Sequence, residues 1–170
     1  MINSRQKGNN AELQVCRILS EWWDGKDYSK TRAEELPFRR TPLSGGWDKK
    51  RAAGDLLKPK KCSLCIEVKK RQEWSWDKLF KNTNKDISNW EIFDYWYQAK
   101  VASKKNEIPI LIFSKNGYPW YVCITTKLKG VILPFLSVPH WNWNLTFYFY
   151  TLSDFIRIKP NPFRTTAEDN

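Results

Sequence analysis

Four side chains in the first half of the chain have the types needed for metal-assisted chemistry on a phosphate. Glu67 and Lys69 lie two residues apart in the stretch CIEVKK, Asp55 precedes Glu67 by twelve residues, and Glu12 lies near the N-terminus. Carboxylate oxygens are ligands that Mg²⁺ prefers, and an ammonium group beside such a cation can orient water or stabilise developing charge. The alternative is an ordinary ion pair between Glu67 and Lys69 on a solvent-exposed strand, which contributes little stability.

The stretch around Glu67 predicts a strand that presents the acid and the amine together. Residues two apart in a strand point to the same face, so Glu67 and Lys69 project to one side while Ile66 and Val68 face an apolar layer. We expect this strand to return from a turn at residues 58–61, as the second arm of a hairpin that begins near Gly54. The acids would then meet at one edge of a sheet, where they would repel one another without a cation.

Two helices and three further strands are expected around this hairpin. Apolar residues at helical spacing predict a helix over residues 9–24, which carries Glu12 and ends at Gly25. Ser88 and Glu91 form a capping box that predicts a second helix over residues 89–104. Apolar, aromatic and β-branched runs predict strands at residues 108–114, 120–125 and 145–152.

The order of these elements predicts an α/β fold with one central mixed β-sheet flanked by helices. The 170 residues, 41% of them hydrophobic, are enough for one domain with a substantial core. We expect a single domain over residues 1–158 and a flexible C-terminal tail over residues 159–170. The N-terminal segment is polar and the longest apolar run is short, so a cytoplasmic protein with no membrane contact is expected.

The positive charge of the chain is concentrated in one segment. The net charge is +11, and residues 39–71 contain eleven Lys or Arg side chains but only three acids. Such a basic segment is typical of a protein that binds a polyphosphate. Nucleic acid is favoured over a membrane surface because no basic amphipathic helix is evident there.

The cysteines and the one histidine do not indicate a zinc site. Cys62 and Cys65 form a lone C-x-x-C with no second pair, whereas zinc needs about four ligands. Reduced thiols are the favoured interpretation for all four cysteines. His140, far along the chain from the acidic motif, is expected in a turn.

Several stretches resemble motifs of a known group of nucleases. Residues 54–69, read as G-D, eleven residues and E-V-K, resemble the PD-(D/E)xK motif, with Gly54 where a proline is commoner. SRQKGNNAELQVCRIL, which starts at Ser4, is similar to the R-x-K-G-x-x-x-E opening of archaeal-type Holliday junction resolvases, a type that some phages also carry. FRRTPLSGG is similar to their R-x-P-x-S-G segment, and WYQAKVASKKNEIPILIF resembles a later helix and strand of wider PD-(D/E)xK nucleases.

The resemblance implies a restriction-endonuclease-like fold and a role for each candidate catalytic residue. Asp55, Glu67 and the carbonyl of Val68 would bind Mg²⁺, for which Mn²⁺ is expected to substitute, and Glu12 would complete the site directly or through water. Lys69 would orient or deprotonate the water, or stabilise the transition state. Ser44 would contact the phosphate, and Gln98 would hydrogen-bond near the water or Lys69.

The resemblance also implies a set of DNA-binding residues. The cations expected to hold backbone phosphates are Arg5, Lys7, Arg39 and Arg40, with Lys70 and Arg71 either joining them or simply solvated. The aromatic C-terminal part goes beyond what the compact archaeal enzymes need. This difference bears on which DNA substrate is preferred more than on the chemistry of cleavage.

The function expected from these features is resolution of four-way DNA junctions by paired, metal-dependent nicks, in recombination and repair. A homodimer is expected because its two-fold symmetry matches that of the junction, and no small-molecule cofactor is needed. One alternative is another PD-(D/E)xK endonuclease that nicks or cuts linear or branched duplex. A second is a DNA-binding module without catalytic activity.

Overall fold

A computed structural model describes residues 4–41, 54–72, 76, 90–128, 133–140 and 143–164, with the side chains of residues 4–7 left undescribed. The elements in chain order are α1 (Ser4–Asp24), η1 (Ala33–Glu35), β1 (Arg39–Arg40), β2 (Leu56–Leu57), β3 (Leu64–Arg71), α3 (Glu91–Ala102), β4 (Ile108–Lys115), β5 (Tyr121–Ile124), β6 (Leu136–His140), β7 (Leu145–Thr151), α4 (Leu152–Phe155) and η4 (Asn161–Phe163).

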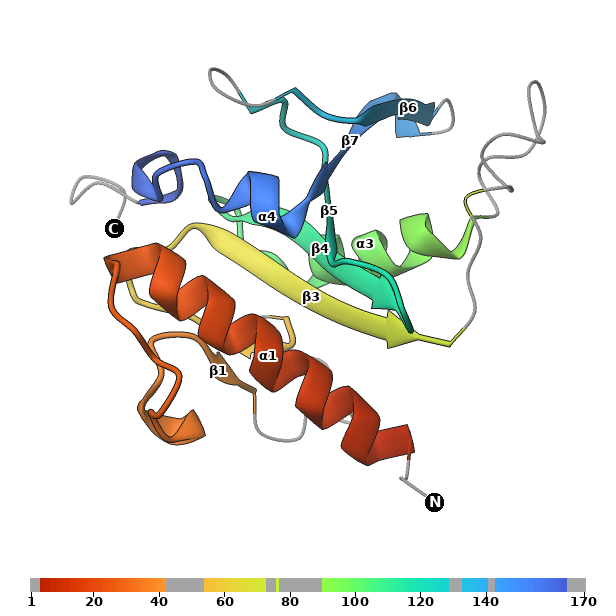
Figure 1. The fold of residues 1–170 in the computed structure, drawn as a ribbon. Coiled ribbons are helices and arrows are strands. Elements are labelled where there is room, and N and C mark those ends of the chain that lie inside the picture. Colours follow the sequence, from red (N-terminus) through yellow and green to blue (C-terminus); the bar gives the residue numbers. More distant parts are fainter. Residues whose placement is uncertain are drawn as a thin grey trace.

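A mixed five-stranded sheet in the order β3-β4-β5-β7-β6 forms the centre of the fold (Figure 1). β3 and β4 are parallel, and the pairs β4–β5, β5–β7 and β6–β7 are antiparallel. Helices α1 and α4 pack on one face of the sheet, and α3 packs on the other. The predicted α/β class, with a central mixed sheet flanked by helices, is therefore confirmed.

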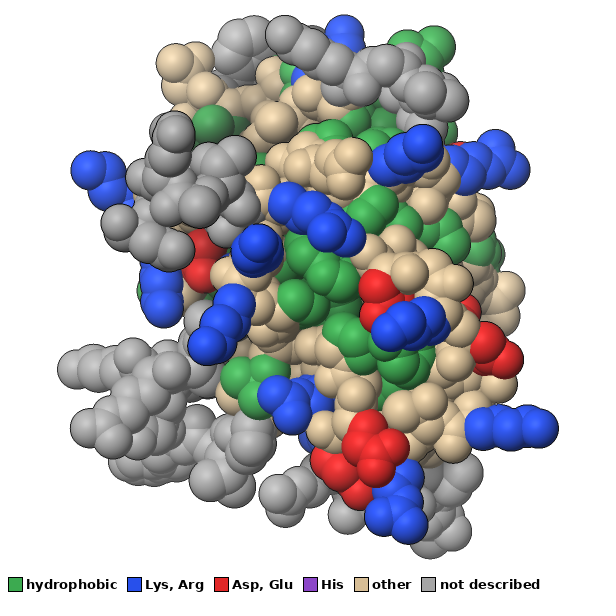
Figure 2. Space-filling model, turned by 90° about the vertical axis from the view of Figure 1, so that its left-hand side faces the viewer, with side chains coloured by type: hydrophobic (Ala, Val, Ile, Leu, Met, Phe, Trp, Pro, Cys, Tyr) green, Lys and Arg blue, Asp and Glu red, His purple; other side chains and the backbone are tan. Residues whose placement is uncertain are grey.

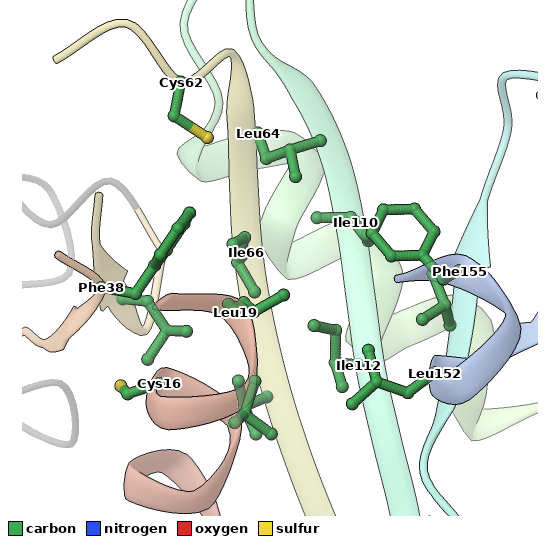
Figure 3. Close-up of a cluster of buried hydrophobic side chains, with 14 of the residues drawn as sticks. Cys16, Leu19, Phe38, Cys62, Leu64, Ile66, Ile110, Ile112, Leu152 and Phe155 are labelled. Carbon is green, nitrogen blue, oxygen red and sulfur yellow. The ribbon is translucent and has the colours of Figure 1, made fainter. Parts of the chain in front are cut away.

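The alternation of side chains along β3 and β4 determines which residues meet each helix. Ile66 of β3 and Ile110 and Ile112 of β4 face α1 and α4, where they pack with Leu19 and Leu152 (Figure 3). All five side chains are at most 3% exposed, so this layer is a closed apolar core. It fixes α1 against the strand that carries the acid and the amine.

The second apolar layer lies between the other face of the sheet and α3. Leu111 and Phe113, which alternate with the isoleucines of β4, pack here with Phe93 and Trp96 of α3 and Phe147 of β7. Because α3 covers this face, the side chains of β3 that point away from the first layer are directed towards α3. Glu67 and Lys69 belong to that set.

Several elements agree with the sequence-based predictions. The first helix ends at Asp24, where Gly25 has a positive φ of 75°, although it begins earlier than expected, at Ser4. The strands expected at residues 108–114, 120–125 and 145–152 are β4, β5 and β7.

Two predictions about local structure are wrong. β2 does not form a hairpin with β3 but pairs with β1, with Arg40 opposite Leu56. Helix α3 begins at Glu91 rather than at residue 89, and its N-cap residue, Trp90, makes no capping hydrogen bond with its side chain. The expected capping residue, Ser88, lies outside the described residues.

The cysteines and the histidine are all buried. All four cysteines are free thiols, and no group of His, Cys, Asp and Glu in the described part of the chain meets the geometry of a metal site. His140 is wrongly predicted as a turn residue: it lies in β6, is 4% exposed and stacks on Trp143 with 4.1 Å between ring centroids.

The C-terminal part of the chain packs against α1 and the start of β3. Phe163 is 2% exposed, and its carbonyl accepts a 2.8 Å hydrogen bond from the backbone N–H of Ser63. A guanidinium N–H of Arg164 donates to the carbonyl of Trp23 at the end of α1, at 2.9 Å. Residues 165–170 lie outside the described residues. Within the described ranges, no helix has both the length and the apolar character needed to cross a membrane.

Candidate active site

Glu67 and Lys69 project from the same face of β3, as the alternation predicts. The ammonium of Lys69 donates a hydrogen bond to the Glu67 carboxylate, and its Nζ lies 3.8 Å from Oδ2 of Asp55. Glu67 is only 6% exposed and Asp55 is 8% exposed. A solvent-exposed surface ion pair is therefore the wrong interpretation of this pair, and the partly buried Lys69 joins two buried acids in one cluster.

Backbone hydrogen bonds hold Asp55 against the outer edge of β3. Its N–H donates to the carbonyl of Ile66 at 2.9 Å, and its carbonyl accepts from the N–H of Thr41 at 2.9 Å. Its side-chain Oδ2 accepts from the N–H of Val68, also at 2.9 Å. Asp55 is thus fixed on the free edge of the sheet even though β2 does not form a ladder with β3.

Gly54 makes this close approach possible. Its φ of 78° lies in the left-handed region, and a Cβ built at this position would lie 2.5 Å from the carbonyl oxygen of Ile66. A proline, the commoner residue here in the motif that this stretch resembles, is restricted to φ near −65° and could not take this conformation. The glycine therefore fits the way in which this chain brings Asp55 to β3.

The electrostatics of the cluster follow from burial and from neighbouring charges. Burial, followed by the negative charge of Asp55, raises the pKa of Glu67 to about 7. Burial acts to lower the pKa of Lys69, but the charges of Glu67 and Asp55 outweigh it and the pKa is raised. Lys69 therefore carries a stable positive charge between two carboxylates. Glu67 is more easily protonated than a free glutamate.

Glu12 lies near the cluster but has its own partner. Its Oε2 accepts a 2.6 Å hydrogen bond from Nε of Arg40 in β1, whose Nη2 also donates to Oδ1 of Asn9 at 2.5 Å. Burial raises the pKa of Glu12, the bond from Arg40 lowers it, and the charge of Asp55 raises it further. Glu12 is thus within electrostatic range of Asp55, without joining a three-acid metal group among the described residues.

The oxygen atoms at this edge suit a hard divalent cation. Asp55 and Glu67 supply carboxylates, and the carbonyl of Val68 leaves β3 on the same side as its N–H, which bonds to Asp55. Mg²⁺ favours such oxygen ligands and retains water molecules when few protein groups bind it. The donor types of Asp55, Glu67 and Val68 therefore fit Mg²⁺.

Gln98 and Ser44 are the remaining candidate catalytic residues. Gln98 is exposed in α3, and its side chain makes no hydrogen bond to a described residue. Ser44 lies in the undescribed segment 42–53. The α3 residue that does approach the cluster is Tyr95, whose ring centroid is 5.9 Å from Nζ of Lys69. The sequence places Tyr95 in an apolar stripe, so nothing in its pattern indicates this contact.

The predicted DNA-binding residues are distributed over three elements, β3, β1 and α1. Lys70 and Arg71 are exposed at the end of β3, immediately after Lys69. Arg39 is exposed in β1 and donates to the carbonyl of Glu34 at 3.1 Å. Arg5 and Lys7 lie in the first turns of α1, but their side chains are outside the described set.

One residue that the sequence analysis did not single out, Thr41, also supports the site. It is 7% exposed, and its hydroxyl donates to the carbonyl of Gly54 at 3.1 Å while its N–H bonds to Asp55. Thr41 follows β1 directly. This short segment therefore makes two contacts with the site: Arg40 donates a hydrogen bond to Glu12, and Thr41 donates one to Asp55. Its place within FRRTPLSGG was the only available signal.

Comparison with known proteins relates the chain to a family of phage proteins. The model of a family described as "Phage putative PDDEXK endonuclease" matches residues 3–134, which include Glu12, Asp55, Glu67 and Lys69 and end before β6. No curated protein matches the chain, and no solved structure matches it.

Proposed function

We propose that this chain, which belongs to the phage PDDEXK endonuclease family, is a Mg²⁺-dependent DNA endonuclease that resolves four-way junctions. The observation that carries the proposal is the buried cluster of Asp55, Glu67 and Lys69 on one edge of β3. Burying two carboxylates together is unfavourable unless a cation balances them. In a DNA-cleaving site, that cost is offset when the acids bind a metal ion.

The residues of the cluster have complementary roles in phosphodiester hydrolysis. A bound Mg²⁺ ion would activate water and neutralise charge on the scissile phosphate. Asp55, Glu67 and the Val68 carbonyl would hold it, with Glu12 acting through water. Lys69 would orient the attacking water or stabilise the phosphorane-like transition state. We retain Ser44 as a phosphate contact and Gln98 as a hydrogen-bond partner of the water or Lys69 when DNA is bound.

Junction specificity rests on different support from the chemistry. The sequence motifs at Arg5–Glu12 and Arg40–Ser44 resemble motifs of archaeal-type resolvases. A homodimer would place two active sites to nick opposed strands. Recognition would use the shape and backbone of branched DNA rather than base edges. The enzyme would act in the cytoplasm of the host on recombination or repair intermediates.

The alternatives differ in what they cut. The first alternative is that this chain is a PD-(D/E)xK endonuclease that nicks or cuts linear or branched duplex with the same cluster. A non-catalytic DNA-binding module would have no use for the buried acids, since burial and then the charge of Asp55 raise the pKa of Glu67. The nuclease assignment is therefore favoured over the binding module.

A cleavage experiment tests the proposal. A labelled four-way junction, a Y-shaped fork and a linear duplex are each incubated with the protein in Mg²⁺ or in EDTA. We expect paired nicks in the junction with Mg²⁺, and binding without cleavage in EDTA. Equal cutting of the linear duplex would remove the resolvase assignment and leave the nuclease, whereas no cutting of any substrate would overturn both.

Variants connect the result to the proposed site. Asp55→Asn and Glu67→Gln are expected to abolish cleavage while junction binding persists. Asp27→Asn is the matched control, because Asp27 is an exposed acid in the loop after α1. Cleavage at the normal rate by either site variant would show that the metal site lies elsewhere.

A further inference from the structure

The end of β3 and β4 gathers basic side chains beside the catalytic lysine. Arg71 is the register partner of Lys115 across the parallel pair, and Lys70 is the partner of Ser114. Alternation places Lys69, Arg71 and Lys115 on the face of the sheet that α3 covers, and Lys70 on the other. Like charges directly opposite one another are unfavourable, and a bound phosphate would relieve the repulsion between Arg71 and Lys115.

Each of these cations lies over an aromatic ring. The guanidinium of Arg71 is 5.3 Å from the ring centroid of Tyr95, and Nζ of Lys70 is 5.7 Å from that of Trp120. Nζ of Lys115 is 4.1 Å from the ring centroid of Tyr118. Neither Lys70 nor Arg71 forms an ion pair with an acid in the described part of the chain. Tyr95 and Trp120 therefore restrain the charged groups of Arg71 and Lys70 without neutralising them.

The turn between β4 and β5 holds Tyr118 in a fixed position. Its N–H donates to the carbonyl of Lys115 at 3.1 Å, and Gly117 takes a φ of 79°. The hydroxyl of Ser114, which is 2% exposed, lies 3.1 Å from the carbonyl oxygen of Lys115 and 3.0 Å from that of Tyr118. Tyr118 is nevertheless 49% exposed, so an ordered turn presents an aromatic ring and a cation to the outside.

Figure 2 shows the opposite end of the molecule, where β3 begins, which is on the left of Figure 1. Lys and Arg side chains are spread over that face among acidic and apolar ones, and some of them lie close to one another (Figure 2).

We propose that Lys70, Arg71 and Lys115 with their aromatic partners form a strand-end rim that binds the DNA backbone next to the scissile phosphate. The β4–β5 turn, residues 116–120, is then a DNA-contacting element, with Tyr118 as its outermost ring. The inference deepens the proposed function, since it assumes that DNA crosses the cluster of Asp55, Glu67 and Lys69. Because Arg71 follows Lys69 by two residues, the rim holds the DNA on one side of the cleavage position.

The first test measures how many phosphates the rim contacts. Affinity for a labelled junction is measured in EDTA over a range of salt concentrations for the wild type, Lys115→Ala and Lys105→Ala. Each phosphate contact contributes about −0.9 to the slope of log K against log salt concentration. We expect Lys115→Ala to reduce the steepness of the slope by about one contact.

Lys105→Ala is the matched control for this measurement. Lys105 is exposed before β4 begins, at the opposite end of that strand, and its variant is expected to keep the wild-type slope. An unchanged slope for Lys115→Ala, in protein with wild-type circular dichroism, would overturn the rim. Because the assay needs no cleavage, this result stays distinct from a failure of the nuclease proposal.

The second test maps where the turn lies on the DNA. Asn116→Cys is labelled with a thiol-reactive iron–EDTA group, which cuts nearby DNA by hydroxyl radicals. The four native cysteines are buried, and burial raises the pKa of Cys16 and Cys65 to about 12, so the new thiol reacts selectively. We expect cuts confined to one side of the nick that unlabelled enzyme makes in Mg²⁺. Labelled Lys105→Cys is expected to give none there, and equal cutting by both labelled proteins would contradict the proposal.

Discussion

The carboxylate of Asp55 accepts a 2.9 Å hydrogen bond from the backbone N–H of Val68, the residue between Glu67 and Lys69 in β3. This bond places the first acid at the point where the second acid and the lysine leave the strand. The backbone of Asp55 is held by two more bonds, to Ile66 and Thr41. The geometry of the site therefore depends on the backbone at residues 54 and 55 as much as on the charged groups themselves.

Gly54→Ala should inactivate the enzyme without removing a chemical group. The new Cβ would lie 2.5 Å from the Ile66 carbonyl oxygen, in a left-handed conformation that alanine disfavours. We expect a loss of stability of about 1–3 kcal/mol. We also expect cleavage to fall by about 10²-fold, because displacement of a catalytic group by about 1 Å has effects of that size. Urea unfolding and single-turnover cleavage measure the two effects.

Gly25→Ala is the control that separates the effect of backbone strain from the effect of moving a catalytic group. Gly25 has a similar φ of 75°, but a Cβ there would meet no atom within 4 Å, and the residue follows α1 far from β3 in the chain. It should lose stability yet cleave at the wild-type rate. Wild-type cleavage by Gly54→Ala would show that the Asp55 position tolerates movement.

The raised pKa of Glu67 predicts how stability depends on pH. Its pKa is about 7 in the folded protein against an ordinary value of 4.5, because of burial and then Asp55. Between these values the folded state binds more protons than the unfolded state, so stability falls as pH rises from about 4.5 to 7. Thermal unfolding in EDTA should therefore show a wild-type melting temperature that decreases across this window.

Glu67→Gln should remove most of that decrease, since glutamine does not titrate. Mg²⁺ added at pH 8 should raise the melting temperature of the wild type, because ligand that binds the folded state stabilises it. Mg²⁺ should have little effect on the melting temperature of Glu67→Gln. An identical pH dependence in the two proteins would mean that the Glu67 carboxyl does not titrate in this range.

Lys69→Met should separate metal binding from catalysis. The ammonium of Lys69 now interacts with both Glu67 and Asp55, so its removal leaves the two acids freer to bind a cation. We expect tighter Mn²⁺ binding by calorimetry, together with a fall in cleavage of about 10²- to 10⁴-fold, the range for loss of a general acid–base group. Lys70→Met, on the opposite face of β3, should leave the Mn²⁺ affinity unchanged. Weaker Mn²⁺ binding by Lys69→Met would indicate that the lysine shapes the metal site instead.

Local periodicity was sufficient to predict part of the site and most of the sheet. The period of two in β3 places Glu67 and Lys69 on one face, and the apolar runs define β4, β5 and β7. The pairing of β2 was not predictable, because two residues carry no periodic pattern and the chain continues through a turn towards β3. The capping box predicted a start at residue 89, whereas α3 begins at Glu91, directly after the buried Trp90.

The contacts that position the acids come from residues distant in sequence. Arg40 reaches Glu12 from 28 residues away, and Thr41 bonds to Gly54 from 13 residues away. Such contacts depend on how β1 crosses beside α1, which no short sequence pattern encodes. This is why Arg40 was predicted only as a phosphate contact, and why its bond to an acid of the site emerges from the structure.

Arg40→Ala should act on catalysis through Glu12. Nε of Arg40 donates to Oε2 of Glu12 at 2.6 Å, and this bond lowers a Glu12 pKa that burial has raised. Without Arg40, the Glu12 pKa should rise, so the acid limb of the pH–rate profile should move to higher pH. We expect cleavage near neutral pH to fall by about 10- to 100-fold, as is typical when a partner of a metal-site residue is lost. Single-turnover rates from pH 5.5 to 9 would measure both effects.

A double-mutant cycle distinguishes this positioning role from a direct grip on DNA. If Arg40 acts through Glu12, Glu12→Gln and Arg40→Ala should not lose activity additively, and the double variant should resemble Glu12→Gln alone. Junction affinity in EDTA should then change little in any of the three proteins. If Arg40 instead holds a phosphate, the losses should multiply and the salt dependence of binding should weaken in Arg40→Ala. Arg39→Ala, in the neighbouring exposed position with no contact to Glu12, supplies the pattern expected of a phosphate contact.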